Sequence, residues 1–297
     1  MAAGKLTISI DLELAWGVWD HLTATDLRLA EIAERPICAS LIELFDRHRV
    51  PATWPVVAAL LDDASASTRP GPKACWFAPD IVERLMHNKA GHEIGSHSGR
   101  HIYFDTASAD DARADLEFAR SVHGAHGLEF QSFVFPRGCA GHLDAVAGVG
   151  LKVFNAADVG WVETARRLGP RPGRIANLLD KLLPIAPRPA RPERRGELVH
   201  IPKSMLLMGR NGARRFILPV VTRAKLRAGL RRAQETAGIF HLWFHPSNFY
   251  YRRDEQLATL DWFLRHAAEE AAQGRIEIRT LGSYAREPAC ATPDRAA

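Results

Sequence analysis

The alternation of apolar and polar positions along the chain predicts repeated strand and helix units. Short runs rich in β-branched and aromatic residues are typical of buried strands, and longer segments with an apolar stripe are typical of helices. Strands are predicted at residues 6–10, 52–57, 92–95, 132–135, 152–155, 198–201, 239–244 and 276–279. Helices are predicted at residues 30–49, 79–88, 107–123, 142–149, 223–235 and 254–273, with Pro79 in the first turn of the second. Strands that alternate with helices favour a parallel α/β sheet or barrel.

The chain is long enough for one large α/β domain. It has 297 residues, of which 46% are hydrophobic, an ordinary share for a globular protein. We expect residues 1–286 to form a single domain and residues 287–297 to be a disordered tail. A basic, proline-rich stretch at about residues 166–200 interrupts the strand–helix rhythm, and we interpret it as an insertion, either a lid or a surface-docking element.

The positive charge of the chain is concentrated in one region. Residues 161–240 hold 18 Lys and Arg against 5 Asp and Glu, a net charge of +13, whereas the remainder holds 21 against 29, a net charge of −8. Such a region suits an anionic membrane surface or a phosphorylated carrier, and a solvated arginine-rich face is the plain alternative. Because it lacks interleaved aromatic residues and any nucleic-acid motif, no nucleic-acid partner is expected.

The sequence favours a cytoplasmic protein. No apolar run approaches the roughly 20 residues that cross a bilayer, and the chain enters its first strand directly after Met-Ala-Ala-Gly-Lys. The four cysteines form no C-x-x-C pair, which argues against a disulfide framework and a thiolate metal site. Peripheral attachment to the inner membrane surface is compatible with the basic region. The oligomeric state does not follow from the sequence.

A pair of histidines follows one of the predicted buried strands, in His97-Ser98-Gly99-Arg100-His101. Two imidazoles four residues apart, on one helical turn or in a tight loop, are able to bind a single divalent cation. Histidine pairs at this spacing also occur in cores and on surfaces without a metal. The position of the pair beyond the carboxyl end of a strand favours ligation.

Two carboxylates end the first predicted strand, in Ile10-Asp11-Leu12-Glu13. Carboxylates two residues apart point to one side of an extended backbone, where one binds a metal and the other accepts a proton. The alternative is structural, with Asp11 as a helix N-cap and Glu13 in the first helical turn.

Three further polar residues follow other predicted strands: Arg137, Asp158 and His245. In βα barrels the reactive groups gather at the carboxyl ends of the strands, because the loops there vary without disturbing the core. An acid, a base, metal ligands and a cation at five separate strand ends indicate an active site.

This pattern resembles the polysaccharide deacetylases with the NodB homology domain, a carbohydrate esterase family 4-like group, over nearly the whole chain. The matching segments are residues 9–17 (SIDLELAWG), 51–54 (PATW), 91–101 (GHEIGSHSGRH), 135–138 (FPRG) and 242–246 (LWFHP). The resemblance implies a distorted (β/α)7 barrel that hydrolyses an N-acetyl group from an amino sugar. It implies one divalent metal, usually Zn with Co or Mn as alternatives, held by Glu13, His97 and His101. It further implies Asp11 as the general base and His245 as the acid that protonates the leaving amine.

The chain departs from the common family pattern in three motifs. The first motif is Asp-x-Glu where adjacent aspartates are usual, and Pro136 precedes Arg137 where Arg usually comes first. The fourth motif is reduced to Asp158-Val159-Gly160-Trp161. By the resemblance, Arg137 orients the base and Asp158 orients His245, although a loop-capping role for Asp158 stays open. Flat walls for a sugar ring are expected from three tryptophans, each of which also fits a core position: Trp16, Trp161 and Trp243.

The expected substrate is an N-acetylated sugar met inside the cell. A lipid-linked or nucleotide-linked glycan intermediate, or a secondary-metabolite sugar, matches the basic region, whose guanidinium groups suit a phosphate. One alternative is a C–N hydrolase of a cyclic amide or ureide on the same fold. Another is a catalytically dead carbohydrate-binding homologue.

Overall fold

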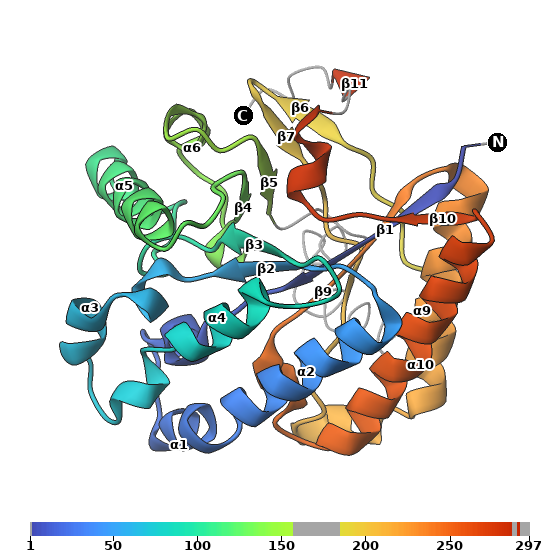
Figure 1. Ribbon diagram of the computed structural model, residues 1–297, viewed down its shortest axis with the longest axis horizontal. Coiled ribbons are helices and arrows are strands. Elements are labelled where there is room, and N and C mark those ends of the chain that lie inside the picture. Colours follow the sequence, from blue (N-terminus) through green and yellow to red (C-terminus); the bar gives the residue numbers. More distant parts are fainter. Residues whose placement is uncertain (1, 157–184, 287–289, 292–297) are drawn as a thin grey trace, which may run out of the picture.

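The computed structural model describes residues 2–156, 185–286 and 290–291, which form a curled, mostly parallel sheet with helices on its outer side (Figure 1). The strands are β1 (Gly4–Ile10), β2 (Thr53–Val56), β3 (Glu93–Ser96), β4 (Ser132–Val134), β5 (Val153–Asn155), β6 (Glu193–Arg195), β7 (Leu198–His200), β8 (Met205–Leu206), β9 (Ile239–Phe244), β10 (Ile276–Ile278) and β11 (Cys290–Ala291). The strand order is β11-β6-β7-β5-β4-β3-β2-β1-β9-β8, with β10 paired to β1. All eight predicted strands are present, and the short β6, β8 and β11 were not predicted.

A single segment closes the sheet into a distorted barrel. β7 pairs with β5 toward one edge of the curled sheet, and only a few residues later β8 pairs with β9 at the opposite edge. The stretch 198–206 therefore acts as one bent strand whose two halves join different neighbours. Counting it once, with β1 to β5 and β9, gives the seven-stranded (β/α) barrel that the sequence predicted.

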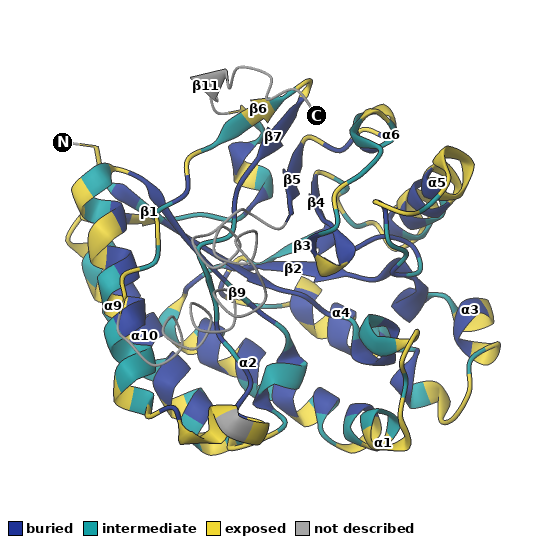
Figure 2. Ribbon diagram, turned by 180° about the vertical axis from the view of Figure 1, so that it is seen from behind, coloured by how far each residue is buried: buried dark blue, intermediate teal, exposed yellow. Residues whose placement is uncertain are grey.

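The helices cover the outer face of the barrel (Figure 2). They are α1 (Ala24–Ile32), α2 (Glu34–His48), α3 (Asp63–Ser67), α4 (Pro79–Met86), α5 (Ala109–Ala125), α6 (Leu143–Gly148), α9 (Pro219–Thr236) and α10 (Arg253–Ala272). Pro79 occupies the first position of α4, as predicted. No helix of the described part of the chain has the length and apolarity to cross a membrane.

The prediction of a single helix at residues 30–49 was wrong, because the chain forms α1 and α2 there, with a break at Ala33. The cause is Pro36 in the first turn of α2. A proline ring clashes with the carbonyl four residues earlier, which here belongs to Ile32, so a continuous helix is disfavoured. Glu34, at the start of α2, is buried.

Strand β1 is buried on both faces, as expected for a central parallel strand. Leu6, Ile8 and Ile10 belong to the apolar core shared with the helices. On the other face, Thr7 Oγ1 lies 2.9 Å from the Tyr284 hydroxyl, and Ser9 Oγ lies 3.0 Å from His241 Nε2. The barrel interior therefore contains polar groups, and these two buried hydroxyls have hydrogen-bonding partners.

The amino ends of the strands, opposite the candidate site, are joined through the carboxylate of Glu93. It accepts hydrogen bonds from Thr53 Oγ1 at 2.8 Å, from Ser132 Oγ at 2.5 Å and from the Gly282 main-chain N–H at 2.9 Å. A Cβ at Gly282 would lie 2.5 Å from this carboxylate, so the approach requires glycine. Strands β2, β3 and β4 and the C-terminal segment are thereby held in register.

The proposed insertion at residues 166–200 lies partly outside the described residues. In its described part, Ala190 bridges to Ile239, and β6 pairs antiparallel with β7. Of the tail expected to be disordered, the structure describes Cys290–Ala291, which pair with β6.

Candidate metal centre and active site

Three strands that end at the same edge of the barrel deliver the candidate residues. Asp11 directly follows β1, and its main-chain N–H donates to Phe244 O at 2.9 Å. His97 directly follows β3, and its N–H donates to Val56 O at 2.8 Å. His245 directly follows β9, and its N–H donates to Asn248 Oδ1 at 3.0 Å. The register of the sheet thus places these side chains together, as the sequence pattern predicted.

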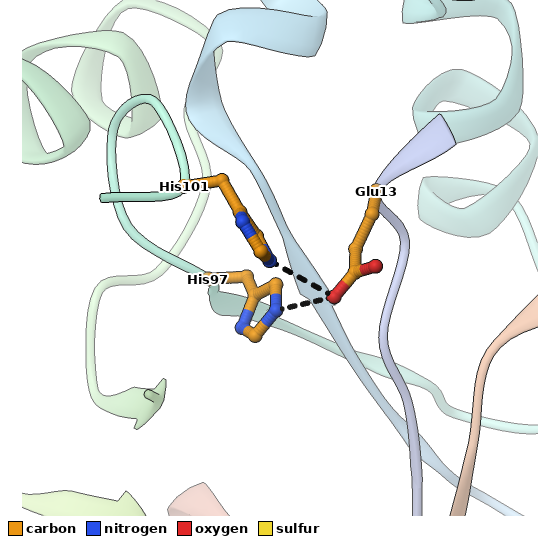
Figure 3. Close-up of side chains that lie close together, drawn as sticks. All are labelled: Glu13, His97 and His101. Atoms are coloured by element: carbon orange, nitrogen blue, oxygen red, sulfur yellow. Dashed lines mark hydrogen bonds and ion pairs between the residues drawn. The ribbon is translucent and has the colours of Figure 1, made fainter. Parts of the chain in front are cut away.

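One carboxylate oxygen of Glu13 faces both predicted histidine ligands (Figure 3). Glu13 Oε1 lies 2.8 Å from His97 Nε2 and 3.2 Å from His101 Nε2, and both imidazoles are 1% exposed. The three groups form a candidate metal-binding cluster. For comparison, two ligand atoms each about 2.1 Å from a tetrahedral zinc ion lie about 3.4 Å apart. The residues therefore fit a divalent cation.

The protonation of His97 supports a cation at this place. His97 Nδ1 lies 2.7 Å from Val134 O, a carbonyl that only accepts, so Nδ1 carries the proton. In the neutral ring, Nε2 then presents a lone pair to the Glu13 carboxylate, which is also an acceptor. Two buried acceptors at 2.8 Å repel each other unless a proton or a metal ion lies between them. The hydrogen bond to Val134 is the kind of second contact that orients a metal-binding imidazole.

The two histidines are held in a tight loop, one of the two arrangements that the sequence allowed. Ser98 and His101 have left-handed backbones, with φ of 70° and 58°. Asp115 of α5 accepts the main-chain N–H of Gly99 at 2.6 Å and of Arg100 at 2.8 Å. A Cβ at Gly99 would lie 2.6 Å from the Asp115 carbonyl oxygen, so glycine is required there. Asp115 therefore sets the shape of the loop.

Beside this cluster lies the candidate acid–base pair. Asp11 is 2% exposed, and its Oδ2 lies 3.8 Å from His245 Nε2. His245 Nε2 also lies 3.4 Å from Glu13 Oε1. Burial lowers the pKa of His245, but the carboxylates of Glu13 and Asp11 outweigh it and raise the pKa to about 9. Burial raises the pKa of Glu13, but His245 and His101 outweigh it and hold that pKa well below its usual value.

Lys203 is a site residue that the sequence analysis missed. It lies in the bend between β7 and β8, and its ammonium is 3.9 Å from the centroid of the Trp243 ring. The Trp243 ring is in turn 5.6 Å from that of His245. Burial lowers the pKa of Lys203, while the charges of Asp11 and Glu13 act to raise it. A lone Lys after a Pro carries no sequence signal, because its role depends on barrel closure.

Arg137 lies on the rim and does not orient Asp11 in this structure. Its Nη2 is 2.9 Å from Asp20 Oδ1, and its guanidinium lies over the Tyr103 ring at 5.1 Å. Pro136 takes the buried position after β4, and Arg137 follows with a left-handed backbone and a 40% exposed side chain. The expectation that Arg137 contacts the base is corrected on this geometry.

Three tryptophans were predicted to form flat walls of the site, and of the two that the structure describes, Trp243 lies beside the site. Trp16 is fully buried and donates its indole N–H to Trp76 O at 3.0 Å, so it is a core residue and the expectation is corrected. Trp161 and Asp158 lie outside the described residues. Trp19, which was not predicted, is 39% exposed and donates its indole N–H to His101 O at 3.1 Å. Its ring stacks on that of Tyr103 at 6.3 Å, which forms an aromatic rim.

A buried carboxyl group behind the site links α2 to the loop after β9. Glu34 is 1% exposed, and its Oε2 accepts a hydrogen bond from the Tyr250 hydroxyl. Burial, assisted by the charge of Glu13, raises the pKa of Glu34 to about 7, although the hydrogen bond from Tyr250 opposes the shift. The loop that carries His245 is thus fastened to a group that titrates near neutral pH.

A family model described as polysaccharide deacetylase matches residues 29–149, about two fifths of the chain. This segment includes His97, His101 and Arg137, whereas Asp11 and His245 lie outside it. No curated protein matches the sequence significantly.

Solved structures share the fold at low identity. A solved structure from Mycobacterium smegmatis, described as a polysaccharide deacetylase, has a TM-score of 0.63 at 15% identity, and the match covers 100% of this chain and 99% of that one. One from Pseudomonas aeruginosa PAO1 has a TM-score of 0.62 at 16% identity, covering 95% and 89%. PuuE allantoinase has a TM-score of 0.63 at 15% identity, also covering 95% and 89%.

The chain shares the barrel fold of these solved structures, and its imidazoles and carboxylates cluster at one edge of that barrel. The match over residues 29–149 identifies a segment similar to the polysaccharide deacetylase family, and it supports carbohydrate N-deacetylation as the activity. This match agrees with the family resemblance that the sequence motifs indicated.

The role of Asp115 in the histidine loop is testable by stability and metal binding. In Asp115→Ala the two N–H groups of Gly99 and Arg100 lose their acceptor, which costs roughly 1–3 kcal/mol of unfolding free energy for each group. We expect the urea midpoint to fall and the affinity for added Zn²⁺ to weaken. Asp110→Ala, an exposed change on the same helix, is the control. A stable Asp115→Ala protein with unchanged Zn²⁺ affinity would show that the loop holds its shape without this carboxylate.

The raised pKa of Glu34 predicts a pH-dependent effect on stability. The folded protein binds a proton here up to about pH 7, while the unfolded chain releases it near 4.5, so stability falls as pH rises across that window. Glu34→Gln removes this ionisation. Relative to wild type, its unfolding free energy should improve by up to about 3 kcal/mol between pH 4.5 and pH 8. Urea unfolding across this range measures the difference. The exposed Glu43→Gln on the same helix should show no such trend, and a flat Glu34→Gln difference would contradict the buried titration.

Proposed function

We propose that the chain is a metal-dependent hydrolase that removes an N-acetyl group from an amino sugar, with one divalent cation held by Glu13, His97 and His101. The observation that carries the proposal is the convergence of two buried imidazoles on one Glu13 oxygen, next to Asp11 and His245. Zn²⁺ suits two nitrogen ligands and one oxygen ligand, and Co²⁺ or Mn²⁺ is an alternative.

The residues around the centre divide the proton transfers between them. A bound divalent cation supplies Lewis acidity toward the amide carbonyl and lowers the pKa of water toward neutrality. Asp11 is placed to accept the proton of the attacking water, because its buried Oδ1 has no hydrogen-bond partner among the described residues. His245, whose pKa is raised to about 9, carries a proton at neutral pH for the departing amine.

Lys203 and Trp243 form the wall of the site on the β8–β9 side. The indole packs against both the Lys203 ammonium and the His245 ring, so it supports each of them in place. We assign Lys203, rather than Arg137, as the cation that balances the charges of Asp11 and Glu13. Trp243 also offers a flat apolar surface to a sugar ring.

The regional charge supports a phosphate-linked substrate class. Between Lys203 and Gln234 there are nine Lys and Arg residues and no Asp or Glu. A sugar attached to a phosphate, either lipid-linked or nucleotide-linked, suits such surroundings. A cyclic ureide has no charge that would use them, although the barrel is similar to that of PuuE allantoinase.

The function is tested by acetate release from a panel of N-acetylated sugars. We expect release that a chelator abolishes and that Zn²⁺, Co²⁺ or Mn²⁺ restores. We also expect a kcat/KM at least tenfold higher for a phosphate-linked sugar than for a free chitooligosaccharide. Allantoin serves as the ureide control.

Chelator-insensitive release would remove the metal from the proposal. Hydrolysis of allantoin, with none of any sugar, would favour a C–N hydrolase of cyclic ureides. Stoichiometric sugar binding without turnover of any substrate would identify a catalytically dead homologue. Equal activity on free and phosphate-linked sugars would refute the assigned substrate class.

The residue roles are tested by separating metal content from turnover. His97→Ala should lose bound zinc together with activity, because it removes a ligand. Asp11→Asn and His245→Ala should retain zinc while kcat falls about 10²- to 10⁴-fold, the usual contribution of general acid–base catalysis. His87→Ala, an exposed histidine on the surface, is the control. Metal loss in the Asp11 or His245 variant, or full activity in either, would overturn the assignment of roles.

A further inference from the structure

Three large apolar side chains project into solvent where the chain enters α9. Phe216 is 69% exposed, Leu218 61% and Val220 65%. They alternate with Ile217, which is buried and anchors the segment, so that its neighbours point outward. We call Phe216, Leu218 and Val220 the apolar ridge. Single exposed apolar residues are common, but three within five positions indicate an interaction surface.

Arginines surround the apolar ridge. Arg214 and Arg215 precede it and are exposed, and the Arg215 guanidinium lies 4.8 Å from the centroid of the Phe216 ring. On the first turns of α9, Arg223 and Arg227 lie over the Trp262 ring, at 5.7 Å and 5.1 Å. The whole stretch 203–234 lacks acidic residues. The partner of this surface therefore carries negative charge beside apolar groups.

The ridge lies at the barrel edge that carries the candidate active site. β8 ends there, and the chain passes through a 3-10 turn (Gly212–Phe216) into α9. Arg252, in the loop that follows His245, donates to the Arg215 carbonyl at 3.4 Å. An added Cβ at Gly209 would lie 3.2 Å from the Asn248 carbonyl, which shows how closely the two loops pack. Figure 2 shows exposed ribbon along this edge, at the start of α9.

We propose that the apolar ridge and its arginines dock the protein onto the surface of an anionic lipid bilayer. Apolar side chains that enter the headgroup region, flanked by arginines that bind lipid phosphates, are the arrangement that holds a protein at a membrane interface. A second copy of the chain fits less well, because two such basic surfaces repel each other. Nucleic acid fits less well because it offers no apolar phase for Leu218 and Val220.

Docking of this kind places the edge with Asp11 and His245 next to the membrane. It therefore favours the lipid-linked member of the proposed substrate class. The docking itself does not depend on hydrolysis, so binding without substrate tests it separately from the proposed function.

The experiment is co-sedimentation of the full chain with vesicles of phosphatidylcholine alone or of phosphatidylcholine and phosphatidylglycerol in equal amounts. Wild type should partition at least tenfold more strongly to the anionic vesicles, and salt should weaken this binding. Phe216→Ser/Leu218→Ser/Val220→Ser and, separately, Arg214→Gln/Arg215→Gln should each lower binding at least tenfold. Ile32→Ser/Met86→Ser and Arg113→Gln/Arg120→Gln are matched controls, exposed on α1, α4 and α5, and should bind as wild type does.

The next four outcomes would count against the proposal. Equal binding to both vesicle types, or undiminished binding by the ridge variant, would overturn it. A wild-type dimer that the ridge substitutions convert to a monomer, with vesicle binding unchanged, would assign the ridge to a second copy. A lower melting temperature of the ridge variant, with vesicle binding unchanged, would show that the three side chains pack within their own chain. Retained hydrolysis of a water-soluble substrate by the ridge variant would confirm that only docking had been altered.

Discussion

The candidate site depends on the position of the Glu13 carboxylate against buried imidazoles. Three ring nitrogens, from His97, His101 and His245, lie within 3.4 Å of its Oε1. Because His97 donates its Nδ1 proton to Val134, its Nε2 lone pair meets an acceptor, and the contact requires positive charge between the two groups. The same oxygen raises the pKa of His245. The candidate metal site and the candidate acid–base pair are therefore electrostatically linked through one residue.

The distortion of the barrel also has a chemical consequence. Because residues 198–206 pair first with β5 and then with β9, the chain bends between β7 and β8, and the bend brings Lys203 to the site. A regular strand would have no bend at this position. The buried His241, within hydrogen-bonding distance of Ser9 and the Pro202 carbonyl, lines the same seam, and burial lowers its pKa to about 3. Closure of the barrel thus places the Lys203 ammonium near the carboxylates of Asp11 and Glu13. It also places the neutral imidazole of His241 where it is a hydrogen-bonding partner for buried polar groups.

The two edges of the barrel differ in the kind of residue that they carry. At the amino ends of the strands, Glu93 joins three strands and the C-terminal segment through hydrogen bonds that leave no room for larger residues at Gly282. At the carboxyl ends, loops with left-handed residues such as Ser98, His101 and Arg137 present the polar groups. This division between a stabilising and a reactive face is general in βα barrels. The apolar ridge lies at this same carboxyl-end edge of the barrel.

The sequence by itself determined the strands, most of the helices and the residues at the strand ends. Alternating apolar runs are local patterns, and the spacing of Asp11, Glu13, His97, His101 and His245 follows from the register of parallel strands. Tertiary structure decided what no local pattern encodes. In the folded chain Trp16 is a buried core residue, and Arg137 forms an ion pair with Asp20. Barrel closure places Lys203 against Trp243, beside the site. The physical reason is that a side chain's neighbours are set by packing between segments far apart in sequence, whereas periodicity reports only on the segment itself.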